Sequence, residues 1–291
     1  MTEEARFRGG RGGRAKGLWL VAVSALFFST AGLFSKGIAA DAWTIIFWRG
    51  VFAVAGAVLW LVVTGRLRGE AARFGRPSVA LAVIYAAGTA AFIPAFKLTS
   101  VANVALIWAA APVLAGALGW WIFGQRMAAG FMLACACVLA GTAIIVWGSF
   151  GGAHLGGDLL ALWMTLMMVL IMIIYRRWPD TPVTLPTVAA SLLLLPVGWM
   201  LGDPASASVW QIALMALFGL TFVVASVTLA GGSTWLAPGE TALVSVSETP
   251  WAILLAGLVL AEWPSPQTVI GGAVIMVAVL WYQVTALRRG A

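Results

Sequence analysis

The chain has 291 residues, of which 62% are hydrophobic and only 9% charged, and its mean hydropathy is +1.01. Soluble domains carry about 25% charged residues, so this composition excludes a water-soluble globular protein and indicates an integral membrane protein. The net charge of +7 does not indicate nucleic-acid binding, because the basic residues stand in short clusters between apolar runs, as the positive-inside rule describes.

Ten apolar stretches are long enough to cross a bilayer, which takes about 20 residues in a helix. Residues 1–16 precede them and are polar and basic, so we expect a disordered cytoplasmic tail there. The first apolar core is longer than that of a secretory signal and counts as a span. In chain order the predicted spans are Leu18–Ile38, Trp43–Thr64, Ser78–Phe96, Ser100–Phe123, Ala128–Trp147, Gly157–Tyr175, Leu185–Leu201, Val209–Ala230, Ala237–Ala261 and Thr268–Leu287.

The distribution of basic residues predicts the orientation of the chain. If the N-terminus is cytoplasmic, every Lys and Arg falls in a cytoplasmic segment except Lys36, Arg49 and Lys97. An even number of spans also returns the C-terminus to the cytoplasm. We therefore expect a multi-pass protein of a bacterial inner membrane, with the lipid bilayer as one partner and both termini inside.

Two of the apolar stretches are related in sequence. Ser100–Gln125 and Ala237–Glu262 have similar length and composition, and aligning them places Pro250 on Pro112. Two related segments that lie half a chain apart indicate an internal duplication.

The duplication predicts two copies of five helices, with the boundary in the glycine-rich loop GSFGGAHLGG around His154. Residues 17–152 form the first copy and residues 153–287 the second. Five is an odd number, so the second copy enters the membrane from the opposite side. The predicted fold is an all-α membrane protein of ten transmembrane helices, arranged as two inverted five-helix repeats around a central cavity, as in secondary transporters.

Several features of residues 17–287 occur together in one known group of proteins. They are an apolar first helix, an Arg early in the second helix (Arg49), and a proline within the fourth and ninth helices. A short polar turn follows each of these two helices, Phe123-Gly124-Gln125 and Leu260-Ala261-Glu262. In these features the chain resembles the drug/metabolite transporter superfamily, and within it the EamA-type carriers.

The resemblance implies a carrier of small organic solutes. The family's turn is typically Leu-Gly-Glu, so Gln125 departs from it and weakens any role for an acid there. Family members export amino acids, metabolites and toxic organic cations, and the general pattern of this chain is most similar to exporters of aromatic amino acids. We expect a monomer or a homodimer.

Glu248 is the acidic residue predicted to lie deepest in the membrane, about eleven residues into the ninth helix. An acid at that depth costs several kcal/mol unless it faces water or a partner. It could be a counter-charge for a substrate ammonium or a proton-coupling group. A protonated carboxyl bonded between two helices is the alternative. Glu240 and Glu262 are expected at helix ends, with structural roles.

Arg49 lies about two turns inside its helix, so its side chain could reach the interface or Asp41. It could instead attract a substrate carboxylate. The structural interpretation is the favoured one, and Lys36 and Lys97 are expected at the outer interface.

Most of the 16 tryptophans stand near span ends, as the aromatic belt requires, but Trp108 and Trp163 fall deeper. Their rings could stack on a flat substrate, although a position facing lipid or packed between helices accounts for them equally well. Polar and aromatic residues of several helices complete the expected cavity lining: Ser29, Tyr85, Thr89, Phe92, Asn103, Ser226, Thr241, Ser245.

Pro112 and Pro250 remove backbone hydrogen bonds within membrane segments. The carbonyls that they free need a partner or a wet cavity, so the prolines predict either gating kinks or polar backbone at the site. Kinked packing alone is the alternative.

The predicted function is therefore a secondary transporter that exports small organic solutes, foremost amino acids including aromatic ones, by alternating access. Exporters of other metabolites or of organic-cation drugs are the alternative. An intramembrane enzyme is the competitor from another class. Against it, the single histidine, His154, lies in a loop, and no metal-ligand motif or nucleotide-binding glycine loop is present. We expect no catalytic residue, metal or cofactor.

Overall fold

The computed structural model describes residues 11–111, 114, 117–118, 121, 129–148, 154–233, 235–236, 241 and 244–290. Within them the regular elements are helices. They are α1 (Arg11–Ser29), α2 (Ala31–Gly37), α3 (Ala42–Val63), α4 (Leu67–Ala72), α5 (Arg76–Leu98), α6 (Val101–Ala109), α8 (Ala129–Gly148), α9 (Leu155–Arg177), α10 (Thr184–Leu201), the 3-10 turn η2 (Pro204–Ser206), α11 (Val209–Ser233), α13 (Glu248–Leu260) and α14 (Pro266–Gly290).

Six helical segments of the described chain are long and apolar enough to cross a membrane. They are Ala15–Gly37, Ala42–Val63, Arg76–Leu98, Leu155–Tyr175, Thr184–Leu201 and Val209–Ser233. Met132–Gly148, Glu248–Leu260 and Pro266–Tyr282 are shorter apolar helices. The all-helical, multi-pass prediction is thus confirmed. The layout of ten spans in two inverted repeats stays a prediction, as do the repeat boundaries.

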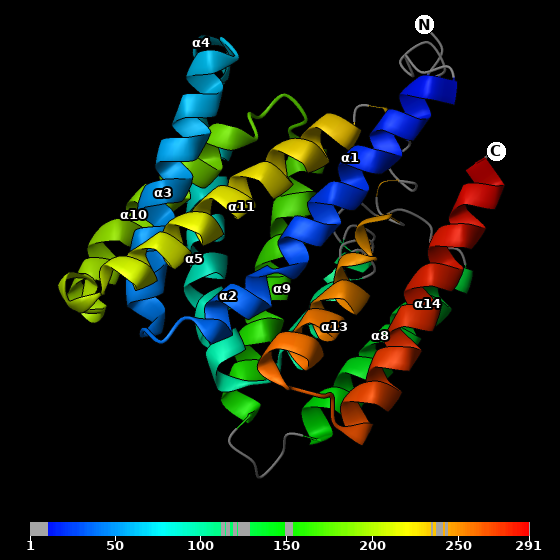
Figure 1. The fold of residues 1–291 in the computed structure, drawn as a ribbon. Helices are drawn as coiled ribbons and strands as arrows, with labels where there is room; N and C mark the ends of the chain where they lie inside the picture. Colours follow the sequence, from blue (N-terminus) through cyan, green and yellow to red (C-terminus); the bar gives the residue numbers. More distant parts are fainter. Residues whose placement is uncertain are drawn as a thin grey trace, which may run out of the picture.

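The helices pack in pairs that join the first part of the chain to the second. α1 lies against α11, α3 against α10 and α11, α5 against α9, α6 against α13, and α8 against α14 (Figure 1). Long apolar helices expose apolar surface that one neighbour alone cannot cover, so each half closes its surface on the other. The two halves are therefore interleaved and are not separate compact bodies.

The chain has two distinct ends in space. The start of α1, the short helix α4 and the last turns of α14 lie at one end, the upper one in Figure 1. The turns after α2, α5 and α13 lie at the other, which we call the distal end. Arg66, Arg68 and Arg73 flank or belong to α4 and are exposed, so these basic side chains gather at the same end as the termini.

One local prediction is wrong. Residues 11–16 belong to α1 and not to a disordered tail, because Arg, Ala and Lys are good helix formers that extend the apolar helix. The linker after α3 also contains a helix, α4, whose Glu70 accepts hydrogen bonds from the backbone N–H groups of Thr184 (3.1 Å) and Leu185 (2.9 Å).

The two proline-bearing segments are interrupted inside the apolar bundle. α6 ends at Ala109, followed by the capping residue Ala110, and Pro112 lies outside the described residues. In the other segment the chain turns at Val246 and Ser247 before α13 begins at Glu248. Pro250 therefore occupies the first turn of a helix, where a missing N–H costs little, and does not kink a continuous helix. The expected mid-helix positions of Glu248 and Pro250 are wrong.

Candidate functional site

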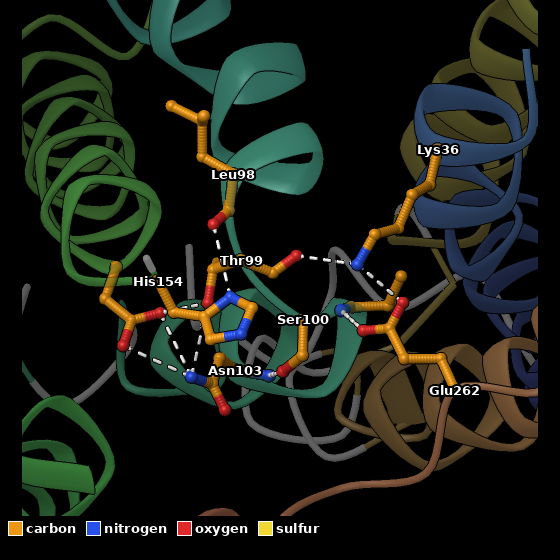
Figure 2. Close-up of polar contacts among 9 residues, drawn as sticks. Lys36, Leu98, Thr99, Ser100, Asn103, His154 and Glu262 are labelled. Atoms are coloured by element: carbon orange, nitrogen blue, oxygen red, sulfur yellow. Dashed lines mark hydrogen bonds and ion pairs between the residues drawn. The ribbon is translucent and has the colours of Figure 1, made fainter. Parts of the chain in front are cut away.

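An ion pair joins distant parts of the chain at the distal end. Lys36, in the last turn of α2, lies 2.5 Å from Oε2 of Glu262, the second residue after α13 (Figure 2). Lys36 also donates to the carbonyl of Thr99 (2.9 Å), and Oε1 of Glu262 accepts from the backbone N–H of Val101 (2.8 Å). One carboxylate thus holds both α2 and the first turn of α6, where an acid complements the helix dipole.

A buried hydrogen-bond chain continues from this ion pair. Asp158, in the first turn of α9, is fully buried, and its Oδ1 accepts from the Thr99 hydroxyl (2.6 Å). The Asn103 amide donates to Asp158 Oδ1 and Oδ2 (3.1 and 3.2 Å), and its carbonyl accepts from the Thr268 hydroxyl (2.5 Å). These residues, with Lys36 and Glu262, form what we call the distal network. It connects α2, α5, α6, α9, α13 and α14.

A pocket of about 370 Å³ lies at the surface of the distal network. Ser100, which caps α6 by accepting from the Asn103 N–H (3.0 Å), forms part of its wall. The His154 ring also borders it, 3.3 Å from the carbonyl of Leu98 (Figure 2). The full lining is polar at most positions: Lys36, Ser100, Asn103, Gly148, His154, Glu262, Trp263, Ser265 and Thr268.

Asp41 caps α3 close to the distal end. Its Oδ1 accepts from the backbone N–H groups of Trp43 and Thr44, both at 2.9 Å. Partial burial is the largest single influence and raises the pKa of Asp41, but hydrogen bonds from Thr44 and Trp43 outweigh it and hold the pKa below its usual value. Nearby, Lys97 donates to the carbonyl of Ile38 (2.9 Å).

Arg49 is not the partner of Asp41. Its side chain is 6% exposed and its guanidinium carbon lies 5.2 Å from the ring centres of Phe218 and Phe222, and 5.9 Å from that of Phe92. Nε has no hydrogen-bond partner. The expectation that the side chain reaches the interface or meets Asp41 is therefore wrong. The Asp41 carboxylate accepts hydrogen bonds from the N-terminus of α3, and aromatic rings surround Arg49.

Glu248 is the first residue of α13, so the length of this helix gives the depth of Glu248 in the membrane. Leu260 lies at the distal end, and the twelve intervening steps place Glu248 about 18 Å from it, which is beyond the middle of a bilayer core about 30 Å thick. Within the described residues, no hydrogen bond or ion pair of the Glu248 side chain is found. In the segment before α13, the Thr241 hydroxyl is likewise buried without a partner, and Ser245 is half-buried.

The other expected cavity residues are distributed over several helices. Ser29 is buried, and its hydroxyl returns to its own helix at the carbonyl of Leu26 (2.7 Å). Trp163 is 48% exposed and donates to the carbonyl of Ala87 (3.2 Å). Asn103 belongs to the distal network, and Trp108 packs against the core around α6. Half-buried positions are occupied by Tyr85, Thr89, Phe92 and Ser226.

Sequence reasoning did not single out Asp158, Thr99 and Thr268, which complete the distal network. An acid in the first turn of a helix is an ordinary capping signal, so Asp158 carried no mark of burial in the sequence. Among the described residues, no group of three or more His, Cys, Asp or Glu side chains could hold a metal ion.

The geometry therefore combines apolar membrane helices, two interrupted segments, and ionisable side chains within the bundle, a combination typical of secondary transporters. In comparison with known proteins, residues 15–147, somewhat less than half of the chain, match the model of the EamA-like transporter family.

The fold is also similar to solved structures. One, titled only as the crystal structure of a protein, is 19% identical, covers 95% of this chain and 99% of its own, and has a TM-score of 0.62. This likeness concerns the fold alone. No curated protein sequence matches the chain.

Proposed function

We propose that the protein is a secondary transporter of a bacterial inner membrane that exports small organic solutes, foremost amino acids including aromatic ones, by alternating access. In this proposal the termini are cytoplasmic, the distal end faces outward, and ten helices form two inverted repeats around a central cavity. The two interrupted segments of α6 and α13 lie in the two halves at the level of that cavity.

The observation that carries the proposal is the start of α13 at Glu248, inside the bundle, where the carboxylate has no partner among the residues that the structure describes. An acid without a partner at membrane depth is costly, so a membrane protein retains one where it faces water or a ligand. Helix α13 also begins at membrane depth, and half-helix ends of this kind line the substrate sites of secondary transporters. Glu248 is the proposed counter-charge for a substrate ammonium.

The distal network supports the alternating-access part of the proposal. It closes the outward end by linking six elements through side chains and a few backbone groups. Such a closure can be made and broken without unfolding a helix. The proposed lining comprises Ser29, Tyr85, Thr89, Phe92, Trp108, Trp163, Ser226, Thr241, Ser245 and Glu248, with Asn103 reached from the distal side. Pro112 and Pro250 are the proposed break points.

The test is counterflow in proteoliposomes loaded with unlabelled phenylalanine. We expect saturable uptake of labelled phenylalanine, and we expect Glu248→Gln to reduce it strongly and to flatten its pH dependence. Glu70→Gln is the matched control, because the glutamine introduced there keeps an oxygen that can accept the two N–H bonds at α10. Unchanged flux and an unchanged pH profile in Glu248→Gln would remove this residue from the mechanism.

An organic cation without a carboxylate is the second candidate substrate, since Glu248 alone would attract it. A panel of aromatic, aliphatic and charged amino acids beside such a cation separates the two. Absence of saturable flux with every compound would contradict the transporter proposal itself.

A further inference from the structure

Arg49 has an unusual environment for a charged side chain. It lies about 10 Å along α3 from Ala42, in the distal half of the bundle. Three phenyl rings surround its guanidinium, and no acidic side chain pairs with it among the described residues. With Phe92, Phe218 and Phe222 it forms what we call the Arg49 box.

The rings of the Arg49 box are themselves held in place. Phe218 stacks on Phe34 of α2 with ring centres 5.3 Å apart, and Phe222 meets Phe28 of α1 edge to face at 5.7 Å. Phe92 meets Phe96 edge to face at 5.1 Å. Helices α1, α2, α5 and α11 thus fix the rings before any ligand arrives, so the box is preorganised.

The aromatic rings stabilise the charge of the guanidinium but leave its hydrogen-bond donors without acceptors. The ring faces attract the positive charge, but they are poor acceptors for five N–H donors held in a rigid fork. Nε is buried and without an acceptor, and no hydrogen bond to either Nη atom is found within the described residues. What the box lacks is a planar acceptor that carries one negative charge.

A carboxylate supplies that acceptor. It pairs with a guanidinium through two parallel N–H···O bonds, whereas a phosphate dianion would bring a second charge that the apolar walls leave uncompensated. The phenyl rings in turn suit an apolar or aromatic body attached to the carboxylate.

We infer that Arg49 binds the carboxylate of the transported solute, and that the substrates are organic carboxylates with an apolar or aromatic body. This inference rests on the proposed function and deepens it. Arg49 and Glu248 lie at different depths, so a zwitterion would meet the cation nearer the distal end and the acid nearer the end that holds the termini.

The first experiment changes the ligand and leaves the protein intact. Purified wild-type protein in detergent is titrated with 3-phenylpropanoate and with 3-phenylpropanamide, which differ only in the charged group, and thermal stabilisation reports binding. We expect the carboxylate to bind about 30-fold or more tightly than the amide, since loss of a hydrogen-bonded charge partner typically has at least this effect. Equal binding of the two compounds would overturn the inference.

The second experiment changes Arg49. Arg49→Gln should abolish the preference for the carboxylate, while Arg49→Lys keeps the charge but not the fork and should retain an intermediate preference. Arg68→Gln, an exposed position in α4, is the control and should keep the wild-type preference. Phenethylamine, which has no carboxylate, should bind wild type and Arg49→Gln equally.

The outcomes separate a binding role from a structural one and from failure of the transporter proposal. A folded Arg49→Gln protein that is less stable but keeps the wild-type preference for 3-phenylpropanoate would overturn the inference. If Arg49→Gln does not fold, the Arg49→Lys variant decides. A smaller preference for 3-phenylpropanoate over the amide than in wild type would support the inference, and an unchanged preference would overturn it. Carboxylate binding without flux in liposomes would leave the site standing and reject the proposed function. Flux in liposomes without a preference for carboxylates would support the proposed function and reject the carboxylate site at Arg49.

Discussion

Asp41 holds the N-terminus of α3 with a single carboxylate oxygen that accepts from two backbone N–H groups. The same turn carries Thr44, whose hydroxyl accepts from the Asp203 N–H (2.9 Å) after α10. An otherwise exposed side chain therefore fixes the start of one membrane helix at the point where its neighbour approaches.

We expect Asp41→Ala to lower the free energy of unfolding by about 1 kcal/mol, the usual cost of losing an N-cap. Asp41→Asn keeps an acceptor oxygen and should be close to neutral. The hydrogen bonds lower the pKa of Asp41, so its ionised form stabilises the fold above the unfolded pKa of about 3.9 and this contribution is lost as the pH falls through the folded value. Thermal unfolding in detergent between pH 3 and pH 7 measures both effects; equal stability of Asp41→Ala and wild type would contradict them.

At the residue scale, the positions of Arg49 and Glu248 in the sequence placed both ionisable residues within predicted membrane spans. Their surroundings could not be predicted in the same way. Arg49 could reach Asp41 by helix spacing, and the rings that surround it belong to α5 and α11, far along the chain. Asp158 gave no signal because its partners Thr99 and Asn103 come from another part of the chain.

Helices α8 and α14 pack with their backbones almost in contact. A Cβ atom added at Gly141 would lie 2.6 Å from the carbonyl oxygen of Gly271, and one added at Gly271 would lie 2.5 Å from that of Gly141. Small residues allow such close approach of membrane helices. The backbones then pack against each other directly, in place of contacts between larger side chains.

We expect Gly141→Val to destabilise the protein by about 1–3 kcal/mol, because its side chain would overlap backbone that cannot move aside. Gly156→Ala is the control, since a Cβ atom there would meet nothing within 4 Å and the change should be neutral or slightly stabilising. Chemical unfolding followed by Trp fluorescence compares the two. Equal stability of both variants would show that α8 and α14 can separate without cost.

At the element scale, hydropathy located the apolar helices well because a membrane helix must be apolar along its length. The breaks were less predictable. Pro250 indicated an irregularity, but a proline is equally compatible with a kink and with the first turn of a new helix, and only the turn at Val246 and Ser247 decides between them. The helix α4 lies in a polar linker, where hydropathy gives no signal.

The distal network joins parts of the chain that are far apart in sequence. Lys36 and Glu262 form its ion pair, and their side chains are 27% and 21% exposed, so water screens the pair only in part. In the proposed transport cycle this network must open whenever the distal side is accessible.

We expect Glu262→Lys to open the distal end, because Lys36 would then face a like charge. Lys36→Glu combined with Glu262→Lys should close it again only in part, because the swap restores the ion pair but not the hydrogen bonds to the Val101 N–H and the Thr99 carbonyl. Ser35→Cys is the reporter, since Ser35 is buried and its hydroxyl has no hydrogen bond to lose. Cys135 and Cys137 are first replaced by Ala. Labelling by a membrane-impermeant thiol reagent should rise about 5–30-fold in Glu262→Lys, corresponding to a pair worth about 1–2 kcal/mol.

Arg68→Glu, at the opposite end, controls for a general effect of charge reversal. A labelling rate that is the same in wild type, Glu262→Lys and the double variant would mean that the ion pair does not hold the distal end closed.

At the scale of the whole molecule, the sequence was enough to predict an all-helical, multi-pass membrane protein, because this follows from the long apolar stretches along the chain. It was not enough to predict that helices of the two halves interleave, with α1 against α11 and α5 against α9. Pairing of this kind depends on the shape of helix surfaces, and apolar residues that face lipid look the same in sequence as those that face another helix.

The glycine contact between α8 and α14 is reciprocal in a further respect. Gly141 also meets Ile275, four residues after Gly271, and Gly271 meets Ile145, four residues after Gly141. The helices run in opposite directions, since Gly130 meets Trp281 and Gly148 meets Gln267. Two helices whose backbones touch at a pair of glycines can rotate about that contact. A shift along the helix axes would instead press the flanking side chains into the opposite helix. The Gly141–Gly271 contact therefore has the mechanical properties of a pivot, which permits rocking of one helix on the other and resists sliding.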